Sequence, residues 1–281
     1  MTARLRAVPL GIRTRLALAI ASVVGVLAFT WPLLAGRGSL LEYNASAPVL
    51  LGFVLLGVMA VVLIALGDGG IDAKAIAMLG LLAAVGAVLR PLSAGSAGIE
   101  LVFLFIVLGG RVFGAGFGFA LGSITLFASA LLTGGLGPWL PFQMLAASWI
   151  GMGAGLLPHR MRGAFEVTVL AAYAAASGFL YGQFMNLSFW PFTLGPGTAL
   201  SFQPGAPIAE NLHRFVIFSL ATSLGWDLLR AIVLSVGIAV LARPSLAALR
   251  RAARIAAFAG GEPTPAGRPR EGSNLHGDDS R

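Results

Sequence analysis

One acidic and one basic side chain lie inside a strongly apolar stretch near the C-terminal end of the sequence. In SLGWDLLRAIV, Asp227 and Arg230 are three residues apart, and Trp226 stands beside them. At this spacing two side chains share a helix face and can neutralise each other. Charges within an apolar span are costly and usually face a bundle interior or a wet cavity. The pair therefore predicts either a self-contained ion pair that fixes helix packing or a ligand contact with Trp226 as a stacking surface, and both remain open.

Three polar segments between apolar stretches, residues 90–100, 134–143 and 183–214, are candidates for a binding surface. The run GGLGPWLPFQM, residues 134–144, needs only its glycines and prolines to turn, yet it also carries Trp139, Phe142 and Gln143. Residues 183–214 mix aromatic residues with amides and prolines, and loops longer than about 15 residues are often lids or binding loops. These segments predict an aromatic pocket mouth with a few amides, suited to a neutral or zwitterionic ring-bearing ligand. The predicted mouth residues are Trp139, Gln143, Asn186, Trp190 and Phe192.

Residues for other kinds of chemistry are scarce. There is no G-x-x-x-x-G-K-[ST] phosphate loop, and Lys74 is the only lysine, so the chain encodes no ATPase. His159, His213 and His276 lack metal-binding spacing, and the sequence has no cysteine. No G-x-S-x-G nucleophile motif occurs. We therefore expect no catalytic residue, no metal site and no cofactor in this chain.

The elements that must position these residues are membrane-spanning helices. The chain is 57% hydrophobic and only 11% charged, whereas soluble domains carry about 25% charged residues. A spanning helix needs roughly 20 mainly apolar residues. The sequence predicts an all-α polytopic membrane protein. Its eight candidate spans are about 16–35, 48–66, 74–90, 98–110, 113–133, 144–157, 165–182 and 214–242.

The distribution of cationic residues predicts the orientation of these spans. With the N-terminus inside, every Lys and Arg falls on the cytoplasmic side except Arg37, Arg90, Arg214 and the intramembrane Arg230. This asymmetry is the one that the positive-inside rule describes. We therefore expect both termini in the cytoplasm, and we attribute the net charge of +8 to membrane topology rather than to nucleic-acid binding.

The third span has a face of small residues. In AKAIAMLGLLAAVGAVL, the small residues recur every three or four positions, which lets helices approach closely in lipid. The sequence does not decide whether the neighbour is another helix of this chain or a partner protein. The residues of this face are Ala73, Ala77, Gly80, Ala84 and Ala87.

Composition divides the chain into three regions. Residues 1–70 hold a cytoplasmic segment and the first two spans, and residues 71–249 hold the other six. Residues 250–281 form a cytoplasmic basic segment and tail. In this last region RRAARIAAF predicts a short interfacial helix, and the Pro- and Gly-rich residues 260–281 predict disorder.

Much of the second region resembles a known family. Residues 72–192, together with WDLLR of the last span, resemble the substrate-binding S component of energy-coupling factor (ECF) vitamin transporters, especially the actinobacterial and cobalamin-type branches. The specific element is GPW-x-P-x-QM after a glycine-rich span, followed about forty residues later by MN. The segments that carry the resemblance are RVFGAGFGFALGSITLFASALLTGGLGPWLPFQMLAASWIGMGAGLL, YGQFMNLSFWPF and WDLLR.

The resemblance implies a function that composition alone does not. Proteins of this family are six-helix bundles in the bacterial plasma membrane that capture a vitamin or related micronutrient from outside. They deliver it with a transmembrane T component and two ABC ATPase subunits, which use the ATP. The resemblance favours cobalamin as ligand, and it implies that the first two spans form an N-terminal hairpin added to the six-helix core.

The resemblance also implies roles for particular residues. It places Trp139, Pro141, Gln143 and Asn186 in the pocket. It also assigns a docking face for the T component to the small residues of the third span, Ala73, Ala77, Gly80 and Ala84.

Two alternative functions remain open from the residues themselves. A stand-alone secondary transporter could couple uptake to protons through Asp227. A membrane-embedded enzyme acting on lipid or prenyl substrates could use Asp227, Arg230 or Glu100, although no nucleophile or metal cluster accompanies them.

Replacing Trp139 and Gln143 together by alanine tests the predicted pocket mouth. We expect weaker ligand binding without unfolding, because these side chains are predicted to contact the ligand rather than to support the bundle. Equilibrium binding and thermal unfolding, measured on the same preparation, separate the two effects. Unchanged affinity in a folded double variant would contradict the assignment.

Overall fold

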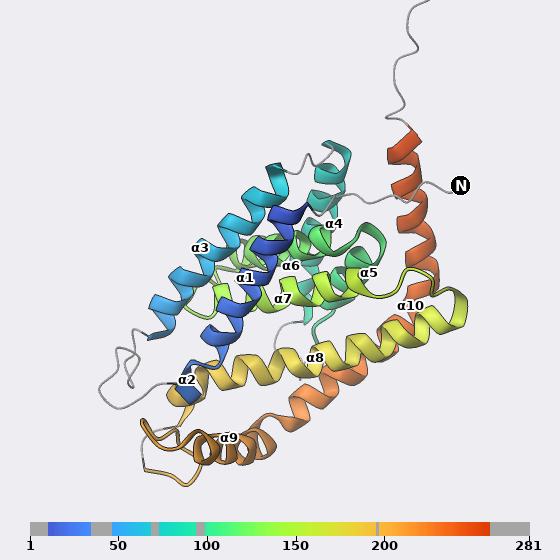
Figure 1. Cartoon of the computed structure of the whole chain (residues 1–281). Coiled ribbons are helices and arrows are strands. Elements are labelled where there is room, and N and C mark those ends of the chain that lie inside the picture. The colour runs from blue at the N-terminus through green and yellow to red at the C-terminus, as the bar shows by residue number, and fades with distance from the viewer. Residues whose placement is uncertain (1–10, 35–46, 69–72, 94–98, 195–196, 259–281) are drawn as a thin grey trace, which may run out of the picture.

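A computed structural model describes the chain except for residues 1–10, 35–46, 69–72, 94–98, 195–196 and 259–281. Every regular element in the described part is a helix (Figure 1). The helices are α1 (Ile12–Phe29), α2 (Trp31–Leu34), α3 (Ala47–Asp68), α4 (Ala73–Ser93), α5 (Val102–Phe113), α6 (Ala115–Thr133), α7 (Leu140–Leu156), α8 (Gly163–Thr193), α9 (Ile208–Thr222) and α10 (Leu224–Phe258).

Most of these helices are membrane helices. Helices α1, α4, α6, α8 and α10 are long and apolar enough to cross a membrane, and α3 and α5 hold shorter apolar segments. The predicted fold class, an all-α polytopic membrane protein, is confirmed. Helices α1 and α3 form the predicted N-terminal hairpin, which packs against α7 and α8.

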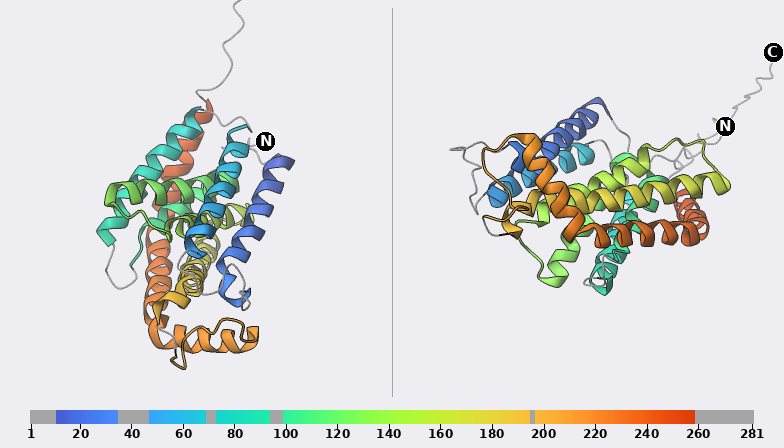
Figure 2. Two further views of the ribbon diagram at one scale, coloured as in Figure 1. Left: turned by 90° about the vertical axis from the view of Figure 1, so that its left-hand side faces the viewer. Right: turned by 90° about the horizontal axis from the view of Figure 1, so that it is seen from below.

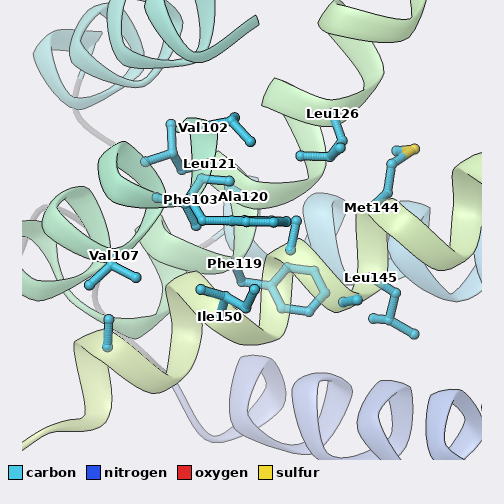
Figure 3. Packing of buried hydrophobic residues seen from close by; sticks show 14 of the residues in the cluster. Val102, Phe103, Val107, Phe119, Ala120, Leu121, Leu126, Met144, Leu145 and Ile150 are labelled. Carbon is cyan, nitrogen blue, oxygen red and sulfur yellow. The ribbon is translucent and has the colours of Figure 1, made fainter. Parts of the chain in front are cut away.

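The centre of the molecule is built by α5, α6 and α7 (Figure 3). Their side chains interdigitate around Phe103, Phe119 and Leu145, all of which are fully buried. With 12 residues, α5 is only about 18 Å long, so it cannot cross a bilayer core of about 30 Å by itself. Burial among its neighbours explains why so short a helix is stable here.

Glycines set the distance between α6 and α7. A Cβ on Gly118 would collide with the backbone of Gly151, and a Cβ on Gly151 would collide with the backbone of Gly118. Without these side chains the two backbones touch, as small residues allow in membrane bundles. The glycine-rich stretches of the predicted fifth and sixth spans therefore serve close packing inside this chain.

A separate aromatic cluster closes one end of the bundle. Helix α9 crosses this end beside α2, as Figures 1 and 2 show. We call this cluster the aromatic cap. It consists of Trp31, Leu187, Trp190, Phe202, Phe215 and Phe218.

The expectation of a loop over residues 183–214 is wrong in its first part. Helix α8 continues to Thr193, so Gln183, Asn186, Trp190 and Phe192 are helical. Hydropathy suggested an earlier end because the amides interrupt the apolar pattern. These amides have hydrogen-bond partners inside the protein, so the helix can continue. Pro191 cannot donate the intrahelical hydrogen bond of its position, and α8 ends two residues later, at Thr193.

The predicted last span is two helices, not one. Helix α9 ends at Thr222 and α10 begins at Leu224, with Ser223 between them. The Thr222 hydroxyl donates to the Phe218 carbonyl at 2.8 Å, a local bond of the kind that bends helices. The predicted interfacial helix over residues 250–258 is likewise not separate, because α10 continues through Phe258.

The predicted loop over residues 134–143 is also shorter than expected. Helix α7 begins at Leu140, so Pro141, Phe142 and Gln143 form its first turn. Proline suits this position because the first N–H groups of a helix have no intrahelical partner. The predicted disordered tail, residues 260–281, lies outside the described residues.

Substituting Gly118 tests the close packing of α6 and α7. We expect Gly118→Ala to destabilise the protein by about 1–3 kcal/mol, because the added Cβ meets backbone that cannot rotate away. The matched control is Gly57→Ala on α3, where a Cβ meets nothing within 4 Å and should be neutral or mildly stabilising. Thermal unfolding in detergent measures both, and equal effects would contradict the account.

Candidate functional site

A cavity of about 260 Å³ opens at the end of the bundle that carries α9. Its walls come from the end of α4, the residues just before α5, the start of α7, the second half of α8 and the start of α10. The cavity therefore lies where five separate parts of the chain meet. The lining residues are Arg90, Glu100, Gln143, Tyr181, Gly182, Met185, Asn186, Ser223, Trp226, Asp227 and Arg230.

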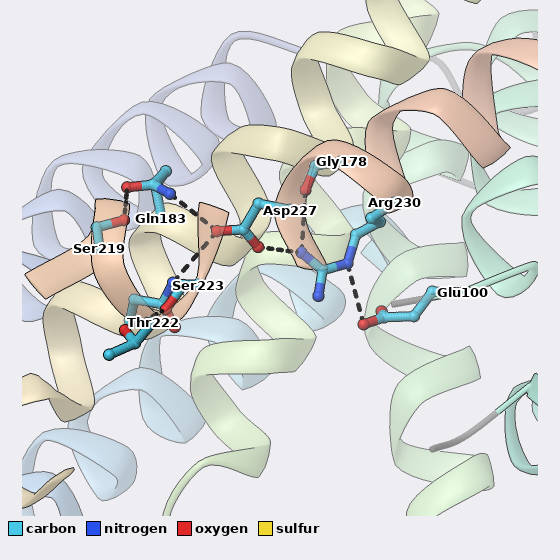
Figure 4. A network of polar contacts seen from close by, with 9 residues as sticks. Glu100, Gly178, Gln183, Ser219, Thr222, Ser223, Asp227 and Arg230 are labelled. Atoms are coloured by element: carbon cyan, nitrogen blue, oxygen red, sulfur yellow. Dashed lines mark hydrogen bonds and ion pairs between the residues drawn. The ribbon is translucent and has the colours of Figure 1, made fainter. Parts of the chain in front are cut away.

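Arg230 is the centre of a charged network at this cavity (Figure 4). Its Nη1 donates to Oδ1 of Asp227 at 2.6 Å, and its Nε donates to Oε1 of Glu100 at 3.1 Å. The guanidinium carbon lies 5.5 Å from the centroid of the Tyr181 ring, within cation–π range. One buried cation thus joins α10 to the residue before α5 and to α8.

Asp227 has partners on both of its oxygens. Its Oδ2 accepts hydrogen bonds from Nε2 of Gln183 at 2.8 Å and Nδ2 of Asn186 at 3.3 Å. Gln183 in turn accepts a hydrogen bond from the Ser219 hydroxyl of α9 at 2.8 Å. With 2% of Asp227 exposed, these bonds replace the water that a buried carboxylate needs.

Glycines on α8 make room for this network. A Cβ on Gly182 would collide with the carboxylate of Asp227 and the guanidinium of Arg230. One turn earlier, the Gly178 carbonyl accepts a hydrogen bond from Arg230 Nη1 at 3.4 Å. Close approach of α8 to α10 is therefore part of how the charges are held.

The opposite wall of the cavity carries a second arginine. Nη2 of Arg90 donates to Oε1 of Gln143 at 2.8 Å, joining the end of α4 to the start of α7. Glu100 lies outside the membrane-spanning helices, and burial raises the pKa of its carboxyl although Arg230 and Arg90 act in the opposite direction. The cavity thus offers both hydrogen-bond donors and acceptors to a ligand.

A second charged cluster lies at the other end of the same helices. Oε1 of Glu166, near the start of α8, accepts from Nε of Arg111 at 2.7 Å and from Nη2 of Arg250 at 2.6 Å. Arg111 also donates to the Leu157 carbonyl at 3.0 Å. This cluster joins α5, α8 and α10 but borders no part of the cavity described above.

Half of the residues predicted from the sequence to bind a ligand line the cavity, and the others lie elsewhere. Phe142 is fully buried in the core, and Trp190 belongs to the aromatic cap. Phe192 packs against that cap. Pro141 is buried at the start of α7. Trp139 is 44% exposed and does not line the cavity. Ligand contact by any of them remains a prediction. Those that line the cavity are Gln143, Asn186, Trp226, Asp227 and Arg230.

The sequence analysis did not predict several lining residues as ligand contacts. Arg90 and Glu100 delimit an outer segment, and Glu100 was considered only for an enzyme, because a charge at the end of a span is usually solvated. Tyr181 and Met185 looked like ordinary members of an apolar helix. Only the fold, which brings Glu100 to Arg230 across 130 positions of sequence, makes these residues neighbours.

The described residues show no arrangement suited to metal binding. In this part of the chain no three His, Cys, Asp or Glu side chains gather closely enough to hold a metal ion. The charged groups at the cavity are paired with one another. They present hydrogen-bonding capacity to a ligand, and Tyr181 and Trp226 present aromatic surface.

Comparison with protein families gives one match. A family model described as "ECF transporter, substrate-specific component" matches residues 74–242, which is more than half of the chain. No curated protein and no solved structure matches this chain. The matched range includes every residue that lines the cavity and begins after the N-terminal hairpin.

Removing Arg230 tests the charged network. We expect Arg230→Met to cost about 3–5 kcal/mol of stability, because Asp227 and Glu100 would lose their shared cation. Arg214→Met is the control, since Arg214 pairs with a largely exposed Glu210 and such pairs contribute at most about 1 kcal/mol. Chemical or thermal unfolding compares the two, and a smaller loss at Arg230 than at Arg214 would contradict this account.

Proposed function

The chain belongs to the substrate-specific components of ECF transporters, and from this premise we propose that it captures a vitamin or related micronutrient in the cavity around Arg230. The observation that carries the proposal is the cavity itself, in which buried charges meet aromatic side chains at one end of the bundle. Ligand sites of small molecules commonly combine apolar walls with a few convergent polar groups.

The charges of the lining indicate the class of ligand. Two cations, Arg90 and Arg230, face two carboxylates, Glu100 and Asp227. Because these charges balance, the site has no excess of either sign to neutralise a ligand with a net charge. A neutral or zwitterionic compound with a ring suits it best, since Trp226 offers a stacking surface.

Cobalamin, the ligand favoured by the resemblance, remains a prediction, and the cavity sets a condition on it. Pockets for small molecules usually measure about 300–1,000 Å³, and this cavity measures about 260 Å³. A corrinoid would therefore require the segments around the cavity to move apart. A compound with a single ring would require little or no movement.

The positions of the cations support an orientation with the cavity outside and both termini in the cytoplasm. Lys74, Arg111, Arg160 and Arg162 all lie near the helix ends opposite the cavity. The cavity end carries fewer cations, among them Arg90. By the positive-inside rule the end opposite the cavity faces the cytoplasm, which leaves the cavity open to the outside of a bacterial plasma membrane.

The small-residue face of α4 supports docking of the T component. Its four proposed contacts are all exposed, and a Cβ added at Gly80 meets nothing within 4 Å. The other side of α4 packs against α6 inside this chain, as the contact of Gly86 with Thr125 shows. Two ATPase subunits would then drive uptake through the T component. The contacts are Ala73, Ala77, Gly80 and Ala84.

Enlarging Gly80 tests the proposed partnership. We expect Gly80→Leu to reduce the amount of T component that copurifies with this chain by about tenfold or more, because a bulky side chain blocks close helix approach. The measurement is affinity purification from cells that also express the T component and both ATPases, quantified by mass spectrometry.

The matched control for this experiment is Gly57→Leu. Gly57 is an exposed glycine on α3, and a Cβ there also meets nothing within 4 Å. This variant should retain its partner. No association in the unmodified chain, or equal loss in both variants, would count against docking through α4.

A further inference from the structure

Trp31 on α2 and Phe29 at the end of α1 tie the N-terminal hairpin to α8 by hydrogen bonds in both directions. This tryptophan precedes the residues matched by the family and has a side chain that is 1% exposed. Its indole N–H donates to the Ser188 carbonyl at 3.0 Å, and the Ser188 hydroxyl donates to the Phe29 carbonyl at 3.2 Å. The hairpin is therefore fixed to α8 at a defined position rather than only packed against it.

The ring of Trp31 also completes the aromatic cap. It stacks on Phe192 with 5.9 Å between ring centroids and meets Phe202 edge-on at 6.3 Å. Trp190 continues the cluster, at 5.6 Å from Phe202 and 5.7 Å from Phe215 of α9. Aromatic pairs at these separations attract one another beyond the effect of burial alone. Among the described residues, Trp31 is the buried member of this cluster that comes from the hairpin, and Phe215 and Phe218 are its members on α9.

Helix α9 is connected in turn to the binding cavity. The Ser219 hydroxyl of α9 donates to Gln183, and Gln183 donates to Asp227 in the cavity wall. Immediately after α9, Ser223 lines the cavity itself. A shift of α9 would therefore disturb both a hydrogen-bond partner of Asp227 and part of the wall (Figure 4).

We propose that Trp31 is a positioning residue for the cavity, acting from the N-terminal hairpin through the aromatic cap and α9. The hairpin thereby supports a site that none of its described residues lines. The relevance of this support for ligand capture rests on the proposed function. The support itself does not, and it can be tested without ligand or partner.

Hydrogen–deuterium exchange of the full chain in lipid nanodiscs tests the first step. In Trp31→Ala we expect the amides of α9 to exchange about tenfold faster or more, because local opening becomes easier where packing is lost. Amides of α5, α6 and α7 should keep their rates. Unchanged exchange in α9 would overturn the proposal, and so would a uniform rise along the chain. Trp31→Phe loses the indole N–H but keeps a ring, and we expect the α9 amides to exchange severalfold faster in this variant. If the alanine variant fails to fold, the phenylalanine variant is the test, and unchanged α9 exchange in it would overturn the proposal.

Trp149→Phe is the matched control. Trp149 makes another indole hydrogen bond between the core and the hairpin, to the Ser22 hydroxyl at 3.2 Å, and it lies outside the aromatic cap. Exchange in α9 should stay unchanged in this variant. An equal rise in both phenylalanine variants would overturn the specific role of Trp31, because any loosening of the hairpin would then suffice.

Cysteine labelling tests the second step, from the cap to the cavity. The natural chain has no cysteine, so Ser223→Cys provides a single reactive thiol in the cavity wall. We expect N-ethylmaleimide to label this thiol about tenfold faster or more when Trp31→Ala is added. An unchanged rate would show that the cap does not control the cavity. Neither outcome depends on the importer assignment, because no ligand or T component is present.

Discussion

The structure depends on one constraint, the cost of holding the charge of Arg230 inside an apolar bundle. Such a charge is tolerated only when it is paired and hydrogen-bonded, and its partners come from distant parts of the chain. Asp227 lies one turn away, whereas Glu100 precedes α5 and Gly178 belongs to α8. Satisfying one guanidinium therefore fixes the relative positions of three segments. Gly182 leaves room for the charged groups of Asp227 and Arg230, and the amide of Gln183 gives Asp227 a hydrogen bond. Both residues therefore serve the pairing of this buried charge.

A second buried cluster lies at the end of the bundle away from the cavity. Arg230 and Arg250 are 20 residues apart on α10, which corresponds to about 30 Å along a helix and to the thickness of a bilayer core. Measured along α10, which contains Pro244, the cluster of Arg111, Glu166 and Arg250 lies at most about one membrane thickness from Arg230. We propose that the two clusters mark the two faces of the membrane, with the ligand site at the outer one.

Sequence patterns predicted those parts of the architecture that depend on neighbouring residues. The spacing of Asp227 and Arg230 predicted that they share a helix face and can neutralise each other, and apolar stretches located nearly all the membrane helices. Hydropathy failed where a polar side chain bonds to a buried group instead of water, as Gln183 and Asn186 on α8 bond to Asp227. Such residues resemble loop residues in sequence because their partners are known only once the helices have packed.

The residues of the cavity were only partly predictable, because many of them become neighbours only once the helices have packed. Trp190 and Phe192 are predicted ligand contacts, and in the structure they belong to or pack against the aromatic cap. Glu100 and Arg90 joined the site through contacts that no local pattern records. The role of Trp31 lay beyond sequence reasoning altogether, since its partner Ser188 is 157 positions away.

Native mass spectrometry tests the central claim most directly, namely that this cavity captures a small neutral or zwitterionic micronutrient. The chain is purified without partners from cells grown in rich medium and compared with Asn186→Leu, which puts an apolar side chain into the cavity wall. The account predicts one retained non-lipid molecule on the natural chain and its loss from the folded variant. A chain that carries no such molecule and binds none from a vitamin panel, or a molecule retained equally by the variant, would contradict it.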